Sequence, residues 1–207
     1  MQEDFLKYFP ELTASQKAKL ILLKSIYERW NSMINVISRK DMDNFYIHHV
    51  LHSLAITKLT SFSPGTTILD VGTGGGFPGI PLAIFFPDSE FTLLDSIQKK
   101  IRVVTEVKDE LGLENVIAVR NRVEDEKRKF HFIVSRAVTD FPCFVKLTGK
   151  NLDKKGNNKL QNGIICLKGG DLTEELASFR NRVKVWEINK YFKEPFFETK
   201  KIVYLPV

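Results

Sequence analysis

The stretch DVGTGGGFPG, residues 70–79, is a glycine-rich turn that could hold either a phosphate or a ligand with positive charge. Its spacing Gly74-x-Gly76-x-x-Gly79 fits the dinucleotide fingerprint, in which glycines let the backbone approach a ligand closely. Asp95 follows about 20 positions after Gly72, and an acid at this distance binds ribose hydroxyls in dinucleotide and adenosyl sites alike. A structural turn without ligand is the alternative, but neighbouring glycines cost conformational entropy unless a ligand needs the room.

The residues around the glycines indicate what kind of nucleoside the turn accepts. Asp70 places a carboxylate just before the turn, where it would repel a phosphate. Pro78 and Pro81 remove two backbone N–H donors from the first turn of the following helix. S-adenosylmethionine carries an ammonium and a sulfonium and no phosphate, so the stretch favours this cofactor over NAD.

The elements around the turn are predicted to form a parallel sheet covered by helices. Short apolar runs alternate with helical patterns, the clearest of which is residues 97–111 with Gly112 as C-terminal cap. This alternation is typical of βαβ units, and it places the turn at the carboxyl edge of the sheet, where α/β proteins bind ligands. The runs predicted as strands are residues 68–71, 91–95, 116–119, 132–134 and 164–167.

Helical patterns precede the sheet, and strand-like segments follow it. Residues 13–38 are predicted to form a helix that begins with the capping box Thr13-x-x-Gln16, and a second helix is expected after Asp41. At the other end, residues 183–189 and 201–207 alternate like strands and are expected to pair antiparallel at one edge. The polar segment 153–163 is expected to be an exposed loop.

Several segments together resemble one protein family. ILDVGTGGGFPGIPLAI, residues 68–84, resembles the glycine motif of the bacterial 16S ribosomal RNA guanine-N7 methyltransferases, also called the glucose-inhibited division protein B family. The similarity covers roughly residues 20–170. His52 stands where the family usually has Asp, and Gly75 where many members have Pro. The other matching segments, in family order, are residues 27–41, 48–54, 91–100, 122–125, 134–138 and 167–170.

The resemblance implies an α/β protein with the class I S-adenosylmethionine-dependent methyltransferase fold. That fold is a doubly wound, mostly parallel sheet with an antiparallel edge strand, here preceded by an N-terminal helical extension. We therefore predict a helical extension over residues 1–64 and a methyltransferase domain over residues 65–207.

The implied reaction is methyl transfer from S-adenosyl-L-methionine to N7 of a specific guanine in 16S ribosomal RNA. N7 has an in-plane lone pair and loses no proton when attacked, so no general base is required and no catalytic residue is assigned. We expect the enzyme to act by positioning, which contributes up to roughly 7–11 kcal/mol. Because a cation on N7 would oppose the reaction, we expect the guanine to be recognised through its other edges and by stacking.

The resemblance also suggests site residues. For Glu124 the alternative is a solvated loop acid, and for Arg136 a surface ion pair. Arg122 and Lys168 end strands and are candidates for phosphate contacts, and His49 matches the family's histidine. The predicted cofactor-binding residues are Asp70, Gly72, Gly74, Gly76, Phe77, Asp95, Val123, Glu124 and Arg136, and the RNA-binding candidates are Arg39, His49, Arg122 and Lys168.

A metal site is not expected. His48 and His52 are four positions apart, but the protease motif needs Glu where this chain has His49, and no cysteine has ligand-like spacing nearby. All three histidines are predicted to lie off the apolar stripe of their helix.

Composition sets the remaining expectations. The formal charge of +6 favours an anionic partner, and we expect 16S ribosomal RNA or the small ribosomal subunit. Two cysteines without CxxC spacing, no signal peptide and no long apolar run are typical of a soluble, cytoplasmic protein that does not enter membranes. No feature of the sequence demands more than a monomer.

The alternative functions are an NAD-linked oxidoreductase, supported only by the glycine spacing, and a non-catalytic RNA-binding module, supported only by charge. Basic clusters occur at Lys99, Lys100 and Arg102, at 127–129, and at Lys154, Lys155 and Lys159.

Overall fold

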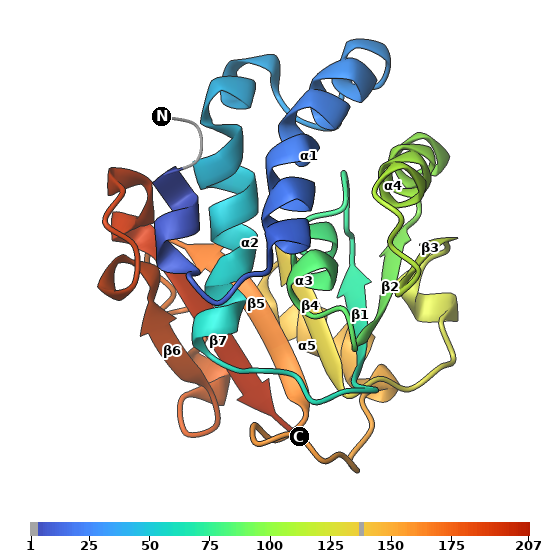
Figure 1. Cartoon of the computed structure of the whole chain (residues 1–207). Coiled ribbons are helices and arrows are strands. Elements are labelled where there is room, and N and C mark those ends of the chain that lie inside the picture. The colour runs from blue at the N-terminus through green and yellow to red at the C-terminus, as the bar shows by residue number, and fades with distance from the viewer. Residues whose placement is uncertain (1–3, 137–138) are drawn as a thin grey trace.

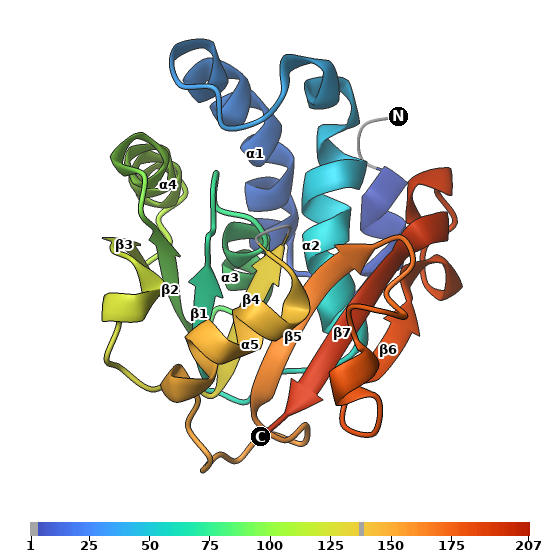
Figure 2. The same ribbon diagram turned by 180° about the vertical axis from the view of Figure 1, so that it is seen from behind.

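The computed structural model describes residues 4–136 and 139–207, and a seven-stranded sheet lies at its centre (Figures 1 and 2). The strand order is β3-β2-β1-β4-β5-β7-β6, and β1 to β5 are mutually parallel. β7 is antiparallel to both of its neighbours, so the two tail strands pair at one edge as expected. The strands are β1 (Thr67–Val71), β2 (Glu90–Asp95), β3 (Val116–Arg120), β4 (Phe132–Arg136), β5 (Gly163–Gly169), β6 (Lys184–Glu187) and β7 (Lys200–Pro206).

The predicted apolar runs form these strands because both faces of the sheet are covered. Along β1, Ile68 joins the larger hydrophobic cluster on one face and Leu69 the smaller cluster on the other. Consecutive side chains of a strand point to opposite faces, so a run that is apolar at every position suits a sheet buried on both sides. The family-like segment 134–138 extends beyond β4, and its last two residues lie outside the described ranges.

Helices α1, α2, α3 and α4 lie on one face of the sheet, and α5 lies on the other (Figures 1 and 2). The switch in strand order falls between β1 and β4, so the loops that follow these strands diverge and leave room at the carboxyl edge. The helices are α1 (Ala14–Met33), α2 (His52–Leu54), α3 (Gly79–Phe85), α4 (Gln98–Glu110) and α5 (Phe141–Thr148).

The first helix begins as predicted and ends earlier. The Thr13 hydroxyl and the Gln16 side chain form the reciprocal capping box. The prediction that the helix continues to residue 38 is wrong, because α1 ends at Met33. The buried Asn31 side chain accepts bonds from the backbone N–H groups of Val36 and Ile37, which turns the chain away from the helix axis.

The predicted second helix is helical but irregular. It starts as the 3-10 helix η2 (Arg39–Asn44) and continues as the π-helix η3 (Tyr46–Leu51), which leads into α2 and the 3-10 helix η4 (Ala55–Lys58). π-Helices are rare and are frequent at functional sites. The segment therefore does not repeat every 3.6 residues, so the positions of its histidines around the helix axis do not follow α-helical spacing.

The C-terminal part contacts the N-terminal helices. Tyr8, which ends η1 (Asp4–Tyr8), donates its hydroxyl to the Glu194 carboxylate. The 3-10 helix η9 (Pro195–Thr199) packs its phenylalanines against the π-helix region. Within the two described ranges, no helix has the length and apolar character that a membrane crossing needs. The division at residues 64 and 65 stays a prediction.

Candidate functional site

The glycine turn follows β1 and is fastened to the neighbouring strand. The N–H groups of Gly72 and Thr73 both donate to the carbonyl of Leu94, at 2.8 and 3.0 Å. Gly76 has φ +97°, and a Cβ there would lie 2.7 Å from the Ile80 side chain. The glycine is therefore required by both backbone conformation and space.

Two buried carboxylates hold the turn in shape. Asp70 Oδ2 accepts bonds from the Thr73 hydroxyl at 2.6 Å and from the Gly79 N–H at 2.8 Å. Asp95 accepts bonds from the N–H groups of Gly74 and Ile97, at 3.0 and 2.9 Å. Asp70 is fully buried and Asp95 nearly so. The sequence predicts Asp70 as a carboxylate just before the turn that would repel a phosphate, whereas in the structure its side chain lies beneath the turn and bonds to it.

Burial raises the pKa of the Asp70 carboxyl from 3.8 to about 7, although bonds from Thr73 and Gly79 oppose the rise. Between these two values the folded protein keeps a proton that the unfolded chain has released. Each increase in pH then favours the unfolded state, by up to about 1.4 kcal/mol per pH unit. The stabilising contribution of the protonated group is therefore lost as the pH rises through about 7.

Asp70→Asn is expected to remove this pH dependence, because the amide has the same shape and does not titrate. The free energy of unfolding of the wild type should fall relative to that of the variant between about pH 4 and pH 7. Urea unfolding at a series of pH values measures the difference, with the exposed Asp88→Asn as control. Parallel curves for wild type and Asp70→Asn would contradict the expectation.

A cavity of about 520 Å³ opens beside the turn, at the carboxyl ends of β1, β2 and β3. Its size is within the range of small-molecule sites. It brings together five of the predicted site residues, Gly72, Asp95, Arg122, Val123 and Glu124. Apolar walls and charged groups occur side by side, which suits a ligand with an aromatic base and polar hydroxyls. The other lining residues are Val71, Leu94, Ser96, Ile97, Lys100, Asn121 and Leu147.

A second cluster forms on the other side of the turn, around Arg136 at the end of β4. The Arg136 guanidinium donates to the His48 carbonyl at 2.8 Å and to His49 Nδ1 at 3.0 Å. It also lies 5.2 Å from the ring centroid of Phe77, which belongs to the turn. Three of the predicted site residues, Arg136, His49 and Phe77, thus lie close together. The bonds of the Arg136 guanidinium go to the π-helix and not to a surface acid.

Asp41, His48 and Tyr27 belong to this cluster but were missed as site residues. Asp41 bridges the two histidine rings, and Tyr27 packs its ring 5.0 Å from that of Phe77. The Tyr27 hydroxyl donates to the carbonyl of Gly75. Tyr27 lies inside the helix predicted over residues 13–38 and Asp41 precedes the second predicted helix, and no spacing rule links either residue to the turn.

Tyr27→Phe is expected to destabilise the protein by about 1–3 kcal/mol, because the buried Gly75 carbonyl loses its donor. Burial raises the pKa of Tyr27 well above its usual range, so the hydroxyl stays a donor at any physiological pH. Thermal unfolding measures the loss, and Tyr191→Phe, at the end of 3-10 helix η8 (Ile188–Lys190), serves as control. Equal melting temperatures for both variants would count against this role of Tyr27.

The remaining RNA-binding candidates lie apart from each other. Arg39 is exposed at the start of η2, and Arg122 is exposed at the rim of the cavity. Lys168, at the end of β5, donates to the Thr139 carbonyl and to the Glu175 carboxylate, both at 2.6 Å. Its ammonium is therefore part of an internal ion pair on the far side of β4.

The prediction that all three histidines lie off the apolar stripe is wrong. His52 is 6% exposed and packs against Phe196 and Phe197, and the side chain of His49 is only 12% exposed. The wider turn of the π-helix shifts the phase, so the apolar spacing of an α-helix does not apply there. Among the residues that the model describes, no group of three potential metal ligands is found.

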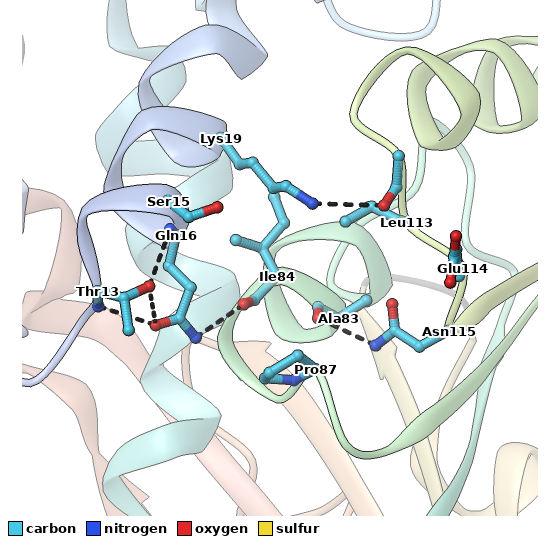
Figure 3. Close-up of a pocket in the computed structure, with 11 residues that line it drawn as sticks. Thr13, Ser15, Gln16, Lys19, Ala83, Ile84, Pro87, Leu113, Glu114 and Asn115 are labelled. Atoms are coloured by element: carbon cyan, nitrogen blue, oxygen red, sulfur yellow. Dashed lines mark hydrogen bonds between the residues drawn. The ribbon is translucent and has the colours of Figure 1, made fainter.

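Another cavity, of about 560 Å³, lies between the start of α1 and the end of α3 (Figure 3). Its polar side chains already bond to backbone carbonyls of the wall. Gln16 donates to Ile84 and Phe85, and Asn115 donates to Ala83. The Gln16 bonds join α1 to α3, and the Asn115 bond joins the loop before β3 to α3, so the cavity has the character of a packing groove and not of a reactive site.

Comparison with known proteins places these features in context. The family model described as rRNA small subunit methyltransferase G matches residues 16–203. The protein of that name from Bacteroides thetaiotaomicron is 52% identical over 202 residues, 98% of each chain. Its counterpart from Christiangramia forsetii is 54% identical over 201 residues, which are 97% of this chain and 95% of the relative.

Solved structures with low sequence identity share the fold. A precorrin-6y C5,15-methyltransferase from Geobacter metallireducens has a TM-score of 0.57 and 12% identity, and the match covers 83% of this chain and 90% of that one. TYW2 from M. jannaschii, in complex with AdoMet, has a TM-score of 0.56 and 15% identity, with 85% and 80% covered. At these identities the likeness concerns the fold, the class I methyltransferase fold with the antiparallel β7 next to the edge strand β6.

Proposed function

The chain belongs to the GidB family, rRNA small subunit methyltransferase G, and we propose that it methylates N7 of one guanine in 16S ribosomal RNA. It is an S-adenosylmethionine-dependent methyltransferase that acts on small-subunit ribosomal RNA. The feature that most supports this function is the conformation of the glycine turn at residues 72–78. It is held by Asp70 and Asp95, and it separates the cavity from the Arg136 cluster.

The residues of the cavity fit S-adenosylmethionine. Gly74 has φ +59°, and a Cβ there would meet nothing closer than the Gly72 carbonyl at 4.0 Å, so the backbone is open to a ligand. Val123 offers an apolar wall for an adenine, and Asp95 keeps lone pairs that can accept ribose hydroxyls. We therefore assign the adenosine part to this cavity, with Glu124 and Arg122 at its rim.

S-adenosylmethionine supplies an electrophilic methyl group on a sulfonium, and the chain supplies position. No residue needs to remove a proton, because guanine N7 attacks with a free lone pair. The contacts of His49 agree with a reaction that needs no general base. Its Nδ1 faces Arg136 and its Nε2 faces Asp41. Both ring nitrogens are engaged, so His49 is not available as a general base.

Arg136 is the cation closest to the turn in this cluster, and we assign it to the cofactor. Two of its five N–H donors bind the π-helix, and the guanidinium lies over the Phe77 ring. Burial lowers the pKa of Arg136 to about 10, while the carboxyl groups of Asp70 and Asp41 oppose the fall. An arginine held in this way can orient a carboxylate of a ligand without contacting the guanine.

The RNA is proposed to bind across the 3-10 helix η2 and the cavity rim, where the exposed Arg39 and Arg122 offer cations to phosphates. For Lys168 the proposal requires that its bond to Glu175 opens on binding. We also propose that the protein acts in the cytoplasm as a monomer, without a metal, on 16S RNA or on the small subunit that contains it.

Methyl transfer from radiolabelled cofactor tests the proposal. Naked 16S RNA, a precursor particle and the assembled small subunit are each incubated with the protein, and cleavage specific for N7-methylguanine maps the product. One labelled guanine in at least one substrate is expected. Label on another atom or none at all would overturn the proposal, as would a melting shift with NAD and none with S-adenosylmethionine.

A further inference from the structure

Asp41 lies at the outer end of a chain of polar contacts that leads to Arg136. Its Oδ1 is 2.5 Å from His48 Nδ1, and its Oδ2 is 2.6 Å from His49 Nε2. His49 Nδ1 is in turn 3.0 Å from a guanidinium nitrogen of Arg136. The three charged or polar groups thus form a row of carboxylate, imidazole and guanidinium.

The chemistry of these groups fixes where the proton of His49 lies. Arginine has only donors, so His49 Nδ1 must accept and carries a lone pair. A neutral imidazole then has its hydrogen on Nε2, and this N–H donates to Asp41. Burial, followed by the charge of Arg136, lowers the pKa of His49 to about 4, so the ring is neutral near pH 7.

The surroundings support a fixed arrangement. Phe45 and Phe77 pack against the His49 ring, with centroids 5.9 and 5.2 Å away. The other histidine that contacts Asp41, His48, stacks on Phe196 of η9, with ring centroids 3.9 Å apart. The π-helix allows two consecutive histidines to reach the same carboxylate, which makes Asp41 the shared acceptor of both rings.

We propose that Asp41 is a positioning residue, which fixes His49 as its Nε2–H tautomer and thereby holds Arg136 against the glycine turn. The carboxylate accepts the N–H of His49, so that the lone pair of the ring faces Arg136. Asp41 and Arg136 both favour this tautomer. Without the carboxylate only Arg136 does, so the Nδ1–H form, which points an N–H at the guanidinium and displaces it, becomes populated. The consequence for methyl transfer rests on the proposed function, whereas the tautomer of His49 does not.

The test measures the tautomer directly. Long-range ¹H–¹⁵N spectra of the full chain with labelled histidine distinguish Nε2–H from Nδ1–H, and His49→Gln assigns the signal. We expect Nε2–H in the wild type, a shift toward Nδ1–H in Asp41→Ala, and retention of Nε2–H in Asp41→Asn, whose amide oxygen still accepts. Asp43→Ala, which removes an exposed acid on the same 3-10 helix, is the matched control and should leave the spectrum unchanged.

Methyl-transfer kinetics give the second readout. Asp41→Ala is expected to lower kcat by about 10-fold or more, because a small displacement of Arg136 misplaces the reactants. Asp41→Asn should recover part of the rate, and Asp43→Ala should match the wild type. The proposal is overturned if the wild type shows Nδ1–H, if Asp41→Ala keeps the wild-type tautomer, or if a shifted tautomer leaves the rate unchanged. Failure of the wild type to methylate RNA would contradict the proposed function, while the spectra would still decide the role of Asp41.

Discussion

Arg136→Lys is expected to slow methyl transfer to ribosomal RNA by about 100-fold, which corresponds to about 2.7 kcal/mol of transition-state free energy. The guanidinium reaches two acceptors on the π-helix and covers the Phe77 ring at the same time. A lysine ammonium is a compact donor on a flexible stem and cannot reproduce this planar fork. Single-turnover methylation and calorimetric titration of the cofactor separate the loss of rate from the loss of affinity.

The exposed Arg180→Lys provides the control for the loss of a guanidinium at constant charge. It should leave both the rate and the melting temperature unchanged. If Arg136→Lys retained wild-type kcat and cofactor affinity, the guanidinium would have no part in the site. A large drop in melting temperature without a change in rate would instead make Arg136 purely structural.

Gly76→Ala is expected to lower the melting temperature by about 6–12 °C and to weaken cofactor binding by at least about 10-fold. The backbone at Gly76 has φ +97°, and the added methyl would lie 2.7 Å from Ile80 and 3.0 Å from the Tyr27 hydroxyl. Strained backbone and overpacking together cost about 3 kcal/mol, and a domain of this size loses about 2–4 °C per kcal/mol. Differential scanning fluorimetry with and without cofactor measures both effects.

Gly65→Ala is the matched control, because it has a positive φ of +75° with no atom within 4 Å of the new methyl. It isolates the cost of the backbone conformation, about 1 kcal/mol, and should leave cofactor binding intact. Similar melting temperatures for the two variants would show that the space around Gly76 can adapt.

The sheet could be predicted because its signals are local. Five apolar runs, each bounded by turn residues, became β1 to β5, and the Thr13 capping box marked the start of α1. The glycine turn was located by spacing, and the strand ends around it were located by the rule that ligands bind at the carboxyl edge. These features depend on a few neighbouring residues, so the sequence contains them directly.

The Arg136 cluster could be predicted only in part, because tertiary contacts create it. The capture of backbone N–H groups by Asn31 ends α1, and the π-helix that follows changes which residues face the core. No periodicity in the sequence indicates that Asp41 reaches both histidines. The partner of Lys168 was missed for the same reason, since Glu175 approaches through the loop after β5.

The position of β7 between β5 and β6 has a consequence for folding of the protein. β6 is made before β7 but pairs only with it, and β5 also has one edge open until β7 arrives. A chain in which β7 has not yet docked therefore exposes the two strand edges that β7 later covers. Because open edges invite pairing with other chains, the stage of folding before β7 docks would be the most prone to aggregation.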